Sequence, residues 1–97
     1  MHARVSILRP KGGQKEQVLR ICEDFLAPAA ERQKGFCGLL VMSDFEADRV
    51  LGITLWDTEA DMLAGQHGEY LQEQLSNLIL FLAEPPVIEH LVVDVMS

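Results

Sequence analysis

The 97-residue sequence has only two cysteines, Cys22 and Cys37. Neither belongs to a CxxC pair or has a histidine at metal-ligand spacing, so no disulfide framework and no cysteine-based metal site is expected. An unpaired cysteine commonly behaves as a small apolar side chain, and we expect both to be buried. This cysteine usage fits a reducing, cytoplasmic compartment.

Lysine and arginine are missing from the second half of the chain. Residues 50–97 contain eight Asp and Glu, whereas all eight basic residues lie within residues 1–49. The formal net charge of the whole chain is −7. An acidic protein repels phosphate backbones and anionic lipid headgroups, so we expect neither nucleic acid nor a membrane as a partner.

Long apolar runs and nucleotide-binding motifs are also missing. No segment approaches the ~20 apolar residues of a membrane span, and Arg4, Arg9 and Lys11 interrupt any signal-peptide-like run. The sequence has no glycine-rich phosphate loop, no GxSxG elbow and no HExxH motif. We therefore expect a cytoplasmic protein of one domain, residues 1–97, that uses no metal, flavin or nicotinamide cofactor.

Two segments are apolar at successive positions, which is unusual for strands with one face in water. Side chains alternate between the two faces of a strand, and a half-buried strand has polar residues at every second position. In residues 35–42 the alternation puts Phe36, Leu40 and Met42 on one face and Cys37, Leu39 and Val41 on the other. In residues 49–56 it separates Leu51, Ile53 and Leu55 from Val50, Thr54 and Trp56.

The order of the remaining elements predicts the fold. Strands are expected at residues 3–8 and 87–96, a helix at 14–27 that ends near Pro28, and helical segments at 58–65 and 69–83. Thr58, three residues before Asp61, resembles a helix-capping box. The resulting β-α-β-β-α-β order predicts an α+β, ferredoxin-like fold, with a four-stranded antiparallel sheet and the helices on one face.

A sheet that is covered by helices on one face only leaves an apolar face exposed. At ~25 cal/mol per Å², the burial of such a face contributes several kcal/mol to association. We therefore expect a homodimer that forms through the open sheet face.

Several segments together resemble a known family. They are Gly35-Phe36, the run from Leu51 to Asp61, His67, and Glu84-Pro85-Pro86. In these segments the chain resembles the antibiotic biosynthesis monooxygenase domain family, over roughly residues 3 to 96. The resemblance implies a dimeric α+β barrel. It also implies a cofactor-independent monooxygenase of quinol-like or polycyclic aromatic compounds, although many members have no known reaction.

His67 is the predicted catalytic residue, because a histidine titrates near neutral pH and can remove a proton from a phenol or quinol. Trp56 and Tyr70 are the predicted substrate-binding residues, as an aromatic wall and a hydrogen-bond donor. Each also has a structural interpretation: His67 as a surface residue, Trp56 as core and Tyr70 as a packing residue. His90 shares strand parity with Ile88 and Val92 and is expected at a dimer interface or in the core.

Three functions stay open at this point. The first is the monooxygenase, and the second is a non-catalytic module that binds an aromatic small molecule on the same scaffold. The third is a haem-binding or haem-degrading protein. Haem-degrading relatives use an asparagine on the first strand, a tryptophan and an iron-ligating histidine, and Trp56 and His67 match the last two. Val5 stands where the asparagine is expected, which makes this function the weakest of the three.

Overall fold

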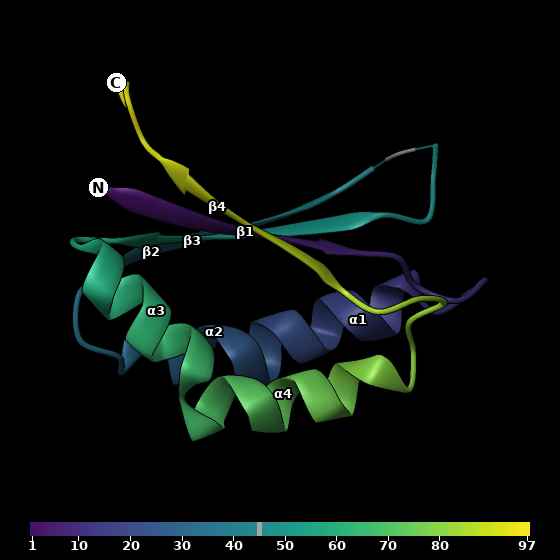
Figure 1. Cartoon of the computed structure of the whole chain (residues 1–97). Coiled ribbons are helices and arrows are strands. Elements are labelled where there is room, and N and C mark those ends of the chain that lie inside the picture. Colours follow the sequence, from purple (N-terminus) through teal and green to yellow (C-terminus); the bar gives the residue numbers. More distant parts are fainter. Residues whose placement is uncertain (45) are drawn as a thin grey trace.

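The structure is a computed structural model that describes residues 1–44 and 46–97, without the side chains of residues 69–71. The strands are β1 (His2–Leu8), β2 (Phe36–Ser43), β3 (Val50–Trp56) and β4 (Val87–Val92). They form one antiparallel sheet in the order β2-β3-β1-β4. All helices lie on one side of it, and the other side is bare (Figure 1). This arrangement confirms the predicted α+β, ferredoxin-like fold.

The first helical region is longer than predicted. It consists of α1 (Lys15–Ile21), a π-helical turn η1 (Cys22–Leu26) and α2 (Ala27–Glu31). The prediction that it ends near Pro28 is wrong. Proline has no N–H to donate to the carbonyl four residues earlier, and its ring clashes with that carbonyl. The π turn changes the hydrogen-bond pattern just before Pro28, so the missing hydrogen bond is not required. The N–H of Ala27 bonds instead to the carbonyl of Cys22, five residues back.

The second helical region is two helices, α3 (Glu59–His67) and α4 (Glu69–Ile79). The predicted cap is confirmed, because Thr58 Oγ1 accepts a hydrogen bond from the N–H of Asp61 at 3.0 Å. The last strand is shorter than predicted. It ends at Val92. One hydrogen bond follows, in which the N–H of Val93 donates to the carbonyl of Met1 at 3.0 Å.

The register of the sheet determines which side chains lie under the helices. Arg4, Ser6 and Leu8 of β1 pair with Thr54, Gly52 and Val50 of β3, and all six face the helices. The main core lies on this side and includes side chains from both layers: Leu8, Val18, Ile21, Cys22, Val50, Leu78 and Leu82.

A β-bulge at Cys37 corrects the predicted faces of β2. The register shifts between Phe36 and Gly38, so Phe36 pairs with Trp56 and lies on the helix side with Leu39 and Val41. The prediction that grouped Phe36 with the open-face residues Leu40 and Met42 is wrong, because one extra residue in a strand reverses the parity of all that precede it.

The two cysteines lie in different environments. Cys22 is buried as predicted, and burial raises the pKa of its thiol to about 11. Cys37 is exposed, contrary to prediction, and its Sγ lies 3.3 Å from Asp57 Oδ1. Desolvation, and then the hydrogen bond to the Asp57 carboxylate, raise the pKa of the Cys37 thiol.

The open face of the sheet carries apolar side chains on every strand, and Glu89 of β4 is a charged residue on it. Leu40 is 54% exposed and Leu91 is 52% exposed, because both lie in the interior of a strand and point away from the helices. Partly buried neighbours continue the surface across the middle of the sheet: Val5, Ile7, Leu51, Ile53 and Leu55. Both faces of the sheet therefore carry apolar side chains, as predicted, and nothing covers one of these faces in the single chain.

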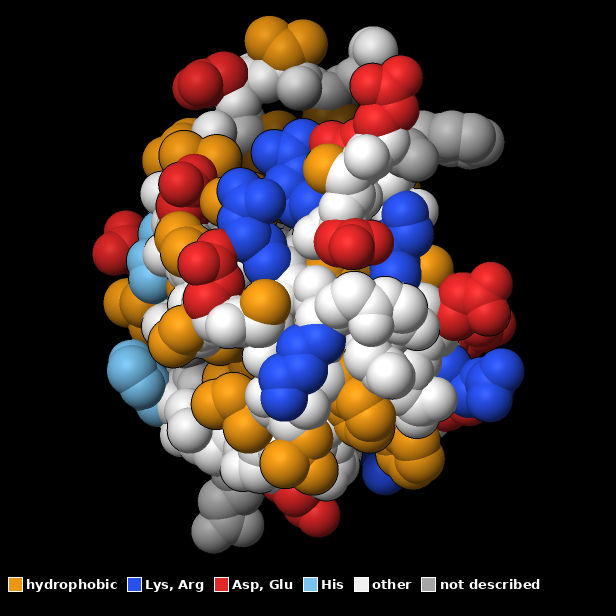
Figure 2. Space-filling view, turned by 90° about the vertical axis from the view of Figure 1, so that its right-hand side faces the viewer, with side chains coloured by type: hydrophobic (Ala, Val, Ile, Leu, Met, Phe, Trp, Pro, Cys, Tyr) orange, Lys and Arg blue, Asp and Glu red, His pale blue; other side chains and the backbone are white. Residues whose placement is uncertain are grey.

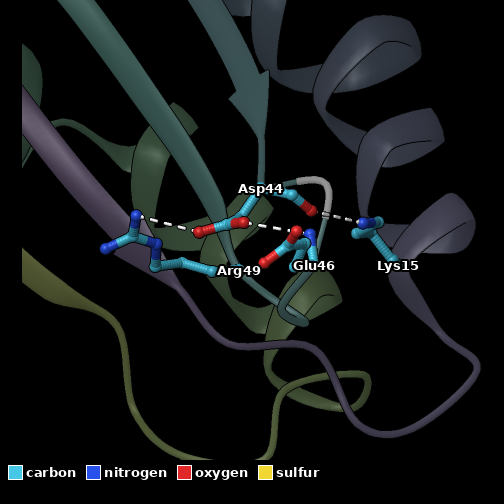
Figure 3. A network of polar contacts seen from close by, with 4 residues as sticks. All are labelled: Lys15, Asp44, Glu46 and Arg49. Atoms are coloured by element: carbon cyan, nitrogen blue, oxygen red, sulfur yellow. Dashed lines mark hydrogen bonds and ion pairs between the residues drawn. The ribbon is translucent and has the colours of Figure 1, made fainter.

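Lys and Arg side chains gather across one end of the molecule, between scattered Asp and Glu (Figure 2). At this end the connection between β2 and β3 is joined to α1. Asp44 Oδ2 pairs with Arg49 at 3.1 Å, and Lys15 Nζ donates to the Asp44 carbonyl at 2.8 Å (Figure 3). The N–H of Glu46, which donates to Asp44 Oδ1, and then the nearby Arg49 hold the pKa of Asp44 below its usual value.

This network predicts a pH-dependent stability difference. A carboxyl whose pKa is lowered by folding stabilises the protein above its unfolded-state pKa, and the contribution disappears as the pH falls through the folded-state pKa. We expect Asp44→Asn to be less stable than the parent protein at pH 7, with a smaller difference at pH 3, which lies below the ordinary aspartate pKa of about 3.9. Urea unfolding at both pH values measures this. A difference of equal size at both values would contradict the assigned role of the carboxylate.

Candidate functional site

A small cavity lies between the sheet and the helix layer. Its lining is almost entirely aliphatic, and its volume is about 40 Å³. Both layers contribute residues: Arg4, Ser6, Leu8, Cys22, Leu26, Leu39, Val41, Gly52, Leu75 and Leu78. A polar guanidinium and a hydroxyl in an otherwise apolar cavity are typical of a site that orients a small ligand.

The cavity exists because small side chains meet at one level of the sheet. Gly52 pairs with Ser6 on one side and with Val41 on the other. A glycine between a serine and a valine leaves space that larger residues would fill. Leu75 and Leu78 of α4 close the space from the helix layer.

Arg4 is the charged residue of this lining, and it is 2% exposed. Its Nη1 donates a hydrogen bond to the Met62 carbonyl at 3.2 Å, and its Cζ lies 5.3 Å from the centre of the Trp56 ring. A buried cation is costly unless such partners compensate for the lost water. The contacts hold the guanidinium at the cavity in a defined place.

Trp56 is fully buried behind Arg4. Its Nε1 donates to Thr54 Oγ1 at 2.9 Å, and its ring meets that of Phe36 edge to face at 5.8 Å. A Cβ on Gly65 of α3 would come within 2.7 Å of the ring, so a glycine allows the helix to lie directly on it. Trp56 is not among the residues that line the cavity. It supports Arg4, whereas the sequence predicted a direct wall for the ligand.

The structure does not bring His67 to the cavity. His67 is the last residue of α3, its side chain is exposed, and it lines none of the described hollows. The side chain of Tyr70 lies outside the described residues. The predicted constellation of His67, Trp56 and Tyr70 therefore stays a prediction.

Sequence reasoning missed Arg4 and Ser6. In a strand of alternating character, polar residues at every second position usually face water, and here they face the helices instead. A sequence signal exists in retrospect, because Gly52 is a glycine inside an apolar strand, which can mark close approach of a ligand or another chain segment.

Two further hollows open at opposite edges of the sheet. One, of about 210 Å³, lies between α3 and β4 and includes His2 and His90. His90 shares the helix side with Ile88 and Val92, as predicted. It is exposed and contacts Gln66, so the predicted core position is wrong, whereas the predicted interface position stays a prediction. The other, of about 340 Å³, lies between η1 and β2.

The described part of the chain offers neither a metal-binding cluster nor a membrane-spanning helix. Within residues 1–44 and 46–97, no group of three or more His, Cys, Asp or Glu is placed to hold a metal ion. Among the helices that the structure describes, none has the length and apolar character needed to cross a membrane.

A family model and several solved structures are similar to this chain. Residues 1–74 match the family model described as antibiotic biosynthesis monooxygenase. A candidate antibiotic biosynthesis monooxygenase from Bordetella bronchiseptica has a similar structure, with a TM-score of 0.85, 19% identity and 97% of each chain covered. A candidate of the same description from Nitrosomonas europaea has a TM-score of 0.83 and 12% identity, covering 98% of this chain and 100% of its own.

A third similar structure is a protein of unknown function from Nitrosomonas europaea. It has a TM-score of 0.83 and 21% identity, and the match covers 99% of this chain and 91% of that one. At these identities the structural similarity shows the fold alone. No curated protein matches the sequence.

Proposed function

The chain belongs to the antibiotic biosynthesis monooxygenase family, and on that premise we propose that it is a homodimeric monooxygenase of a phenolic or quinol-like aromatic compound, without a cofactor. The observation that carries the proposal is the buried Arg4 guanidinium at the wall of an apolar cavity. A fixed cation in a site of low polarity favours the anionic form of a ligand hydroxyl.

The chemistry that this site suits is the oxidation of a phenolate by O₂. A phenol with a free para carbon becomes a para-quinone: one oxygen atom enters the ring and the other leaves as water. All four electrons come from the ring, so no other reductant is required. Loss of the hydroxyl proton makes the ring electron-rich enough to react, and exclusion of water protects the intermediate.

The residues of the cavity have distinct roles in this proposal. Arg4 stabilises the phenolate oxygen, and the Ser6 hydroxyl donates a second hydrogen bond to it. The aliphatic walls contributed by Leu39, Leu75 and Leu78 exclude water. Trp56 acts as a positioning residue, because its ring holds the Arg4 guanidinium in place.

The dimer of this proposal forms through the open face of the sheet. Apolar side chains extend over all four strands of this face, with the charged Glu89 on β4, and large exposed apolar patches mark association sites in water-soluble proteins. The occupant we propose is a second copy of the chain, because two such faces are matched in their apolar character and lie opposite to the helix layer.

A second function, binding without turnover, is favoured by one specific observation. Among the described lining residues the ionisable side chains besides Arg4 are limited to Cys22, and burial raises the pKa of its thiol to about 11. The lining therefore holds no ready base at neutral pH. A binding module would take up the phenol and consume no oxygen.

Oxygen uptake with 1-naphthol separates the two functions. We expect uptake with formation of 1,4-naphthoquinone, and a fall in kcat/KM of about a hundredfold in Arg4→Met, typical for loss of one preorganised charge partner. Arg9→Met is the matched control, because Arg9 is a surface residue paired with Glu84 at 3.0 Å. Binding of 1-naphthol without uptake would identify a binding module, and full activity in Arg4→Met would remove Arg4 from the mechanism.

The predicted base His67 is tested in the same assay. Loss of uptake in His67→Ala, with binding unchanged, would support its role as the proton acceptor. Unchanged uptake would remove His67 from the mechanism and leave the proposed role of Arg4 intact.

A further inference from the structure

The interior cavity and the hollow on the outer side of β2 share three lining residues. These are Cys22, Leu39 and Val41. The outer hollow is about 340 Å³ and is completed by Leu19, Glu23 and Ala27. The hollow at the opposite edge of the sheet has no lining residue in common with the cavity. The cavity therefore adjoins this outer hollow, which we call the groove, and the three shared residues form the junction between the two spaces.

Two features of the fold place this junction between β2 and η1. β2 is an edge strand, so no further strand lies beyond Leu39 and Val41 on that side. Cys22 and Leu26 are the first and last residues of the π-helical turn, and both line the cavity. Single π turns inside α-helices occur frequently at functional sites.

The sizes of the two spaces indicate how a ligand would be divided between them. The inner cavity, at about 40 Å³, is too small for an aromatic ring, whereas the groove of about 340 Å³ has the volume of a small ligand site. A hydroxyl group is small enough for the inner space, where the Ser6 and Arg4 side chains lie.

We propose that the junction of Cys22, Leu39 and Val41 is the entrance through which the hydroxyl end of an aromatic ligand reaches the cavity, and that Val41 and Cys22 determine which ring systems fit against it. The ligand class is a phenol with an uncharged, apolar end opposite its hydroxyl. The hydroxyl leads inward to Arg4 and Ser6, and the rings remain against Leu39, Val41 and the π turn. Glu23 at the groove disfavours a second anionic group on the outer end of the ligand. This inference rests on the proposed function.

The test is the association rate of 1-naphthol, followed by its fluorescence in a stopped-flow instrument under nitrogen. Val41→Phe narrows the junction, and we expect association about tenfold slower than in the parent protein. Val41→Ala widens it, and we expect the three-ring phenol 1-anthrol to bind faster. Far-ultraviolet circular dichroism of both variants verifies that the fold is retained.

Val92→Phe is the matched control for these rates. Val92 is an exposed valine on the helix side of the other edge strand, and it lines the hollow that shares no residue with the cavity. We expect its association rate to equal that of the parent protein. An unchanged rate in Val41→Phe, or a slower rate in Val92→Phe, would overturn the proposed entrance. Absence of 1-naphthol binding to the parent protein would instead contradict the proposed function itself.

Discussion

Replacement of Leu40 by aspartate is expected to convert the proposed dimer into monomers. Leu40 lies on the open face, is 54% exposed in the single chain and contacts none of the helices, so the substitution costs the monomer little. In a dimer formed through this face, each copy would bury an unpaired carboxylate against aliphatic side chains. We expect the dissociation constant to rise about a thousandfold, which corresponds to about 4 kcal/mol. Analytical ultracentrifugation at micromolar concentration measures it.

The matched control is Leu80→Asp. Leu80 is also a highly exposed leucine, but it follows α4 in the helix layer, on the other side of the molecule. The control should remain dimeric. If Leu40→Asp is dimeric as well, or if both variants are monomeric, the open face is not the interface.

Replacement of Trp56 by alanine is expected to have the largest effect on stability. The ring is fully buried between β3 and α3, meets Phe36 edge to face and covers the Arg4 guanidinium. Truncation of a buried aromatic side chain costs about 3–5 kcal/mol. For a domain of this size that corresponds to a melting temperature lower by roughly 15–30 °C. Differential scanning calorimetry measures the change, with all variants at one protomer concentration because association makes the melting temperature concentration-dependent.

Phe25→Ala serves as the control for this prediction. Phe25 is an aromatic residue of the π-helical turn that is 53% exposed, so its truncation should cost no more than about 1 kcal/mol. A Trp56→Ala variant as stable as Phe25→Ala would show that the ring does not support the fold in the way described.

The element order and most of the sheet could be predicted because they depend on local periodicity. The alternation in residues 49–56 groups Thr54 and Trp56 on one face of β3, and in the structure they share the face that the helices cover. The cap at Thr58 depends on a side chain and an N–H only three residues apart. Features of this kind need no information from distant parts of the chain.

The errors arise where one residue changes the local geometry. The extra residue at Cys37 reverses the side of Phe36, and alternation alone does not reveal a bulge. Pro28 was interpreted as a helix end, yet one π turn accommodates it. The bulge at Cys37 and the π turn before Pro28 both depend on contacts with distant parts of the chain, which local periodicity does not contain.

The site was harder to predict than the fold, because its residues are distant in sequence. Arg4 contacts the Met62 carbonyl and the Trp56 ring in the interior, and both follow it in the sequence by more than fifty residues. The space beside Ser6 depends on Gly52 of another strand. His67 has the more suggestive chemistry in the sequence, but its side chain is exposed at the end of α3.

The central claim is that an aromatic ligand binds between the sheet and the helices, and methyl-resolved NMR tests it most directly. The measurement is a titration of leucine- and valine-labelled protein with 1-naphthol under nitrogen. The account predicts shifts at Leu39, Val41, Leu75 and Leu78, with the open-face methyls of Leu40, Leu51 and Leu55 unchanged. Shifts confined to the open face, or to Leu63, Leu91 and Val92 at the other edge, would contradict it.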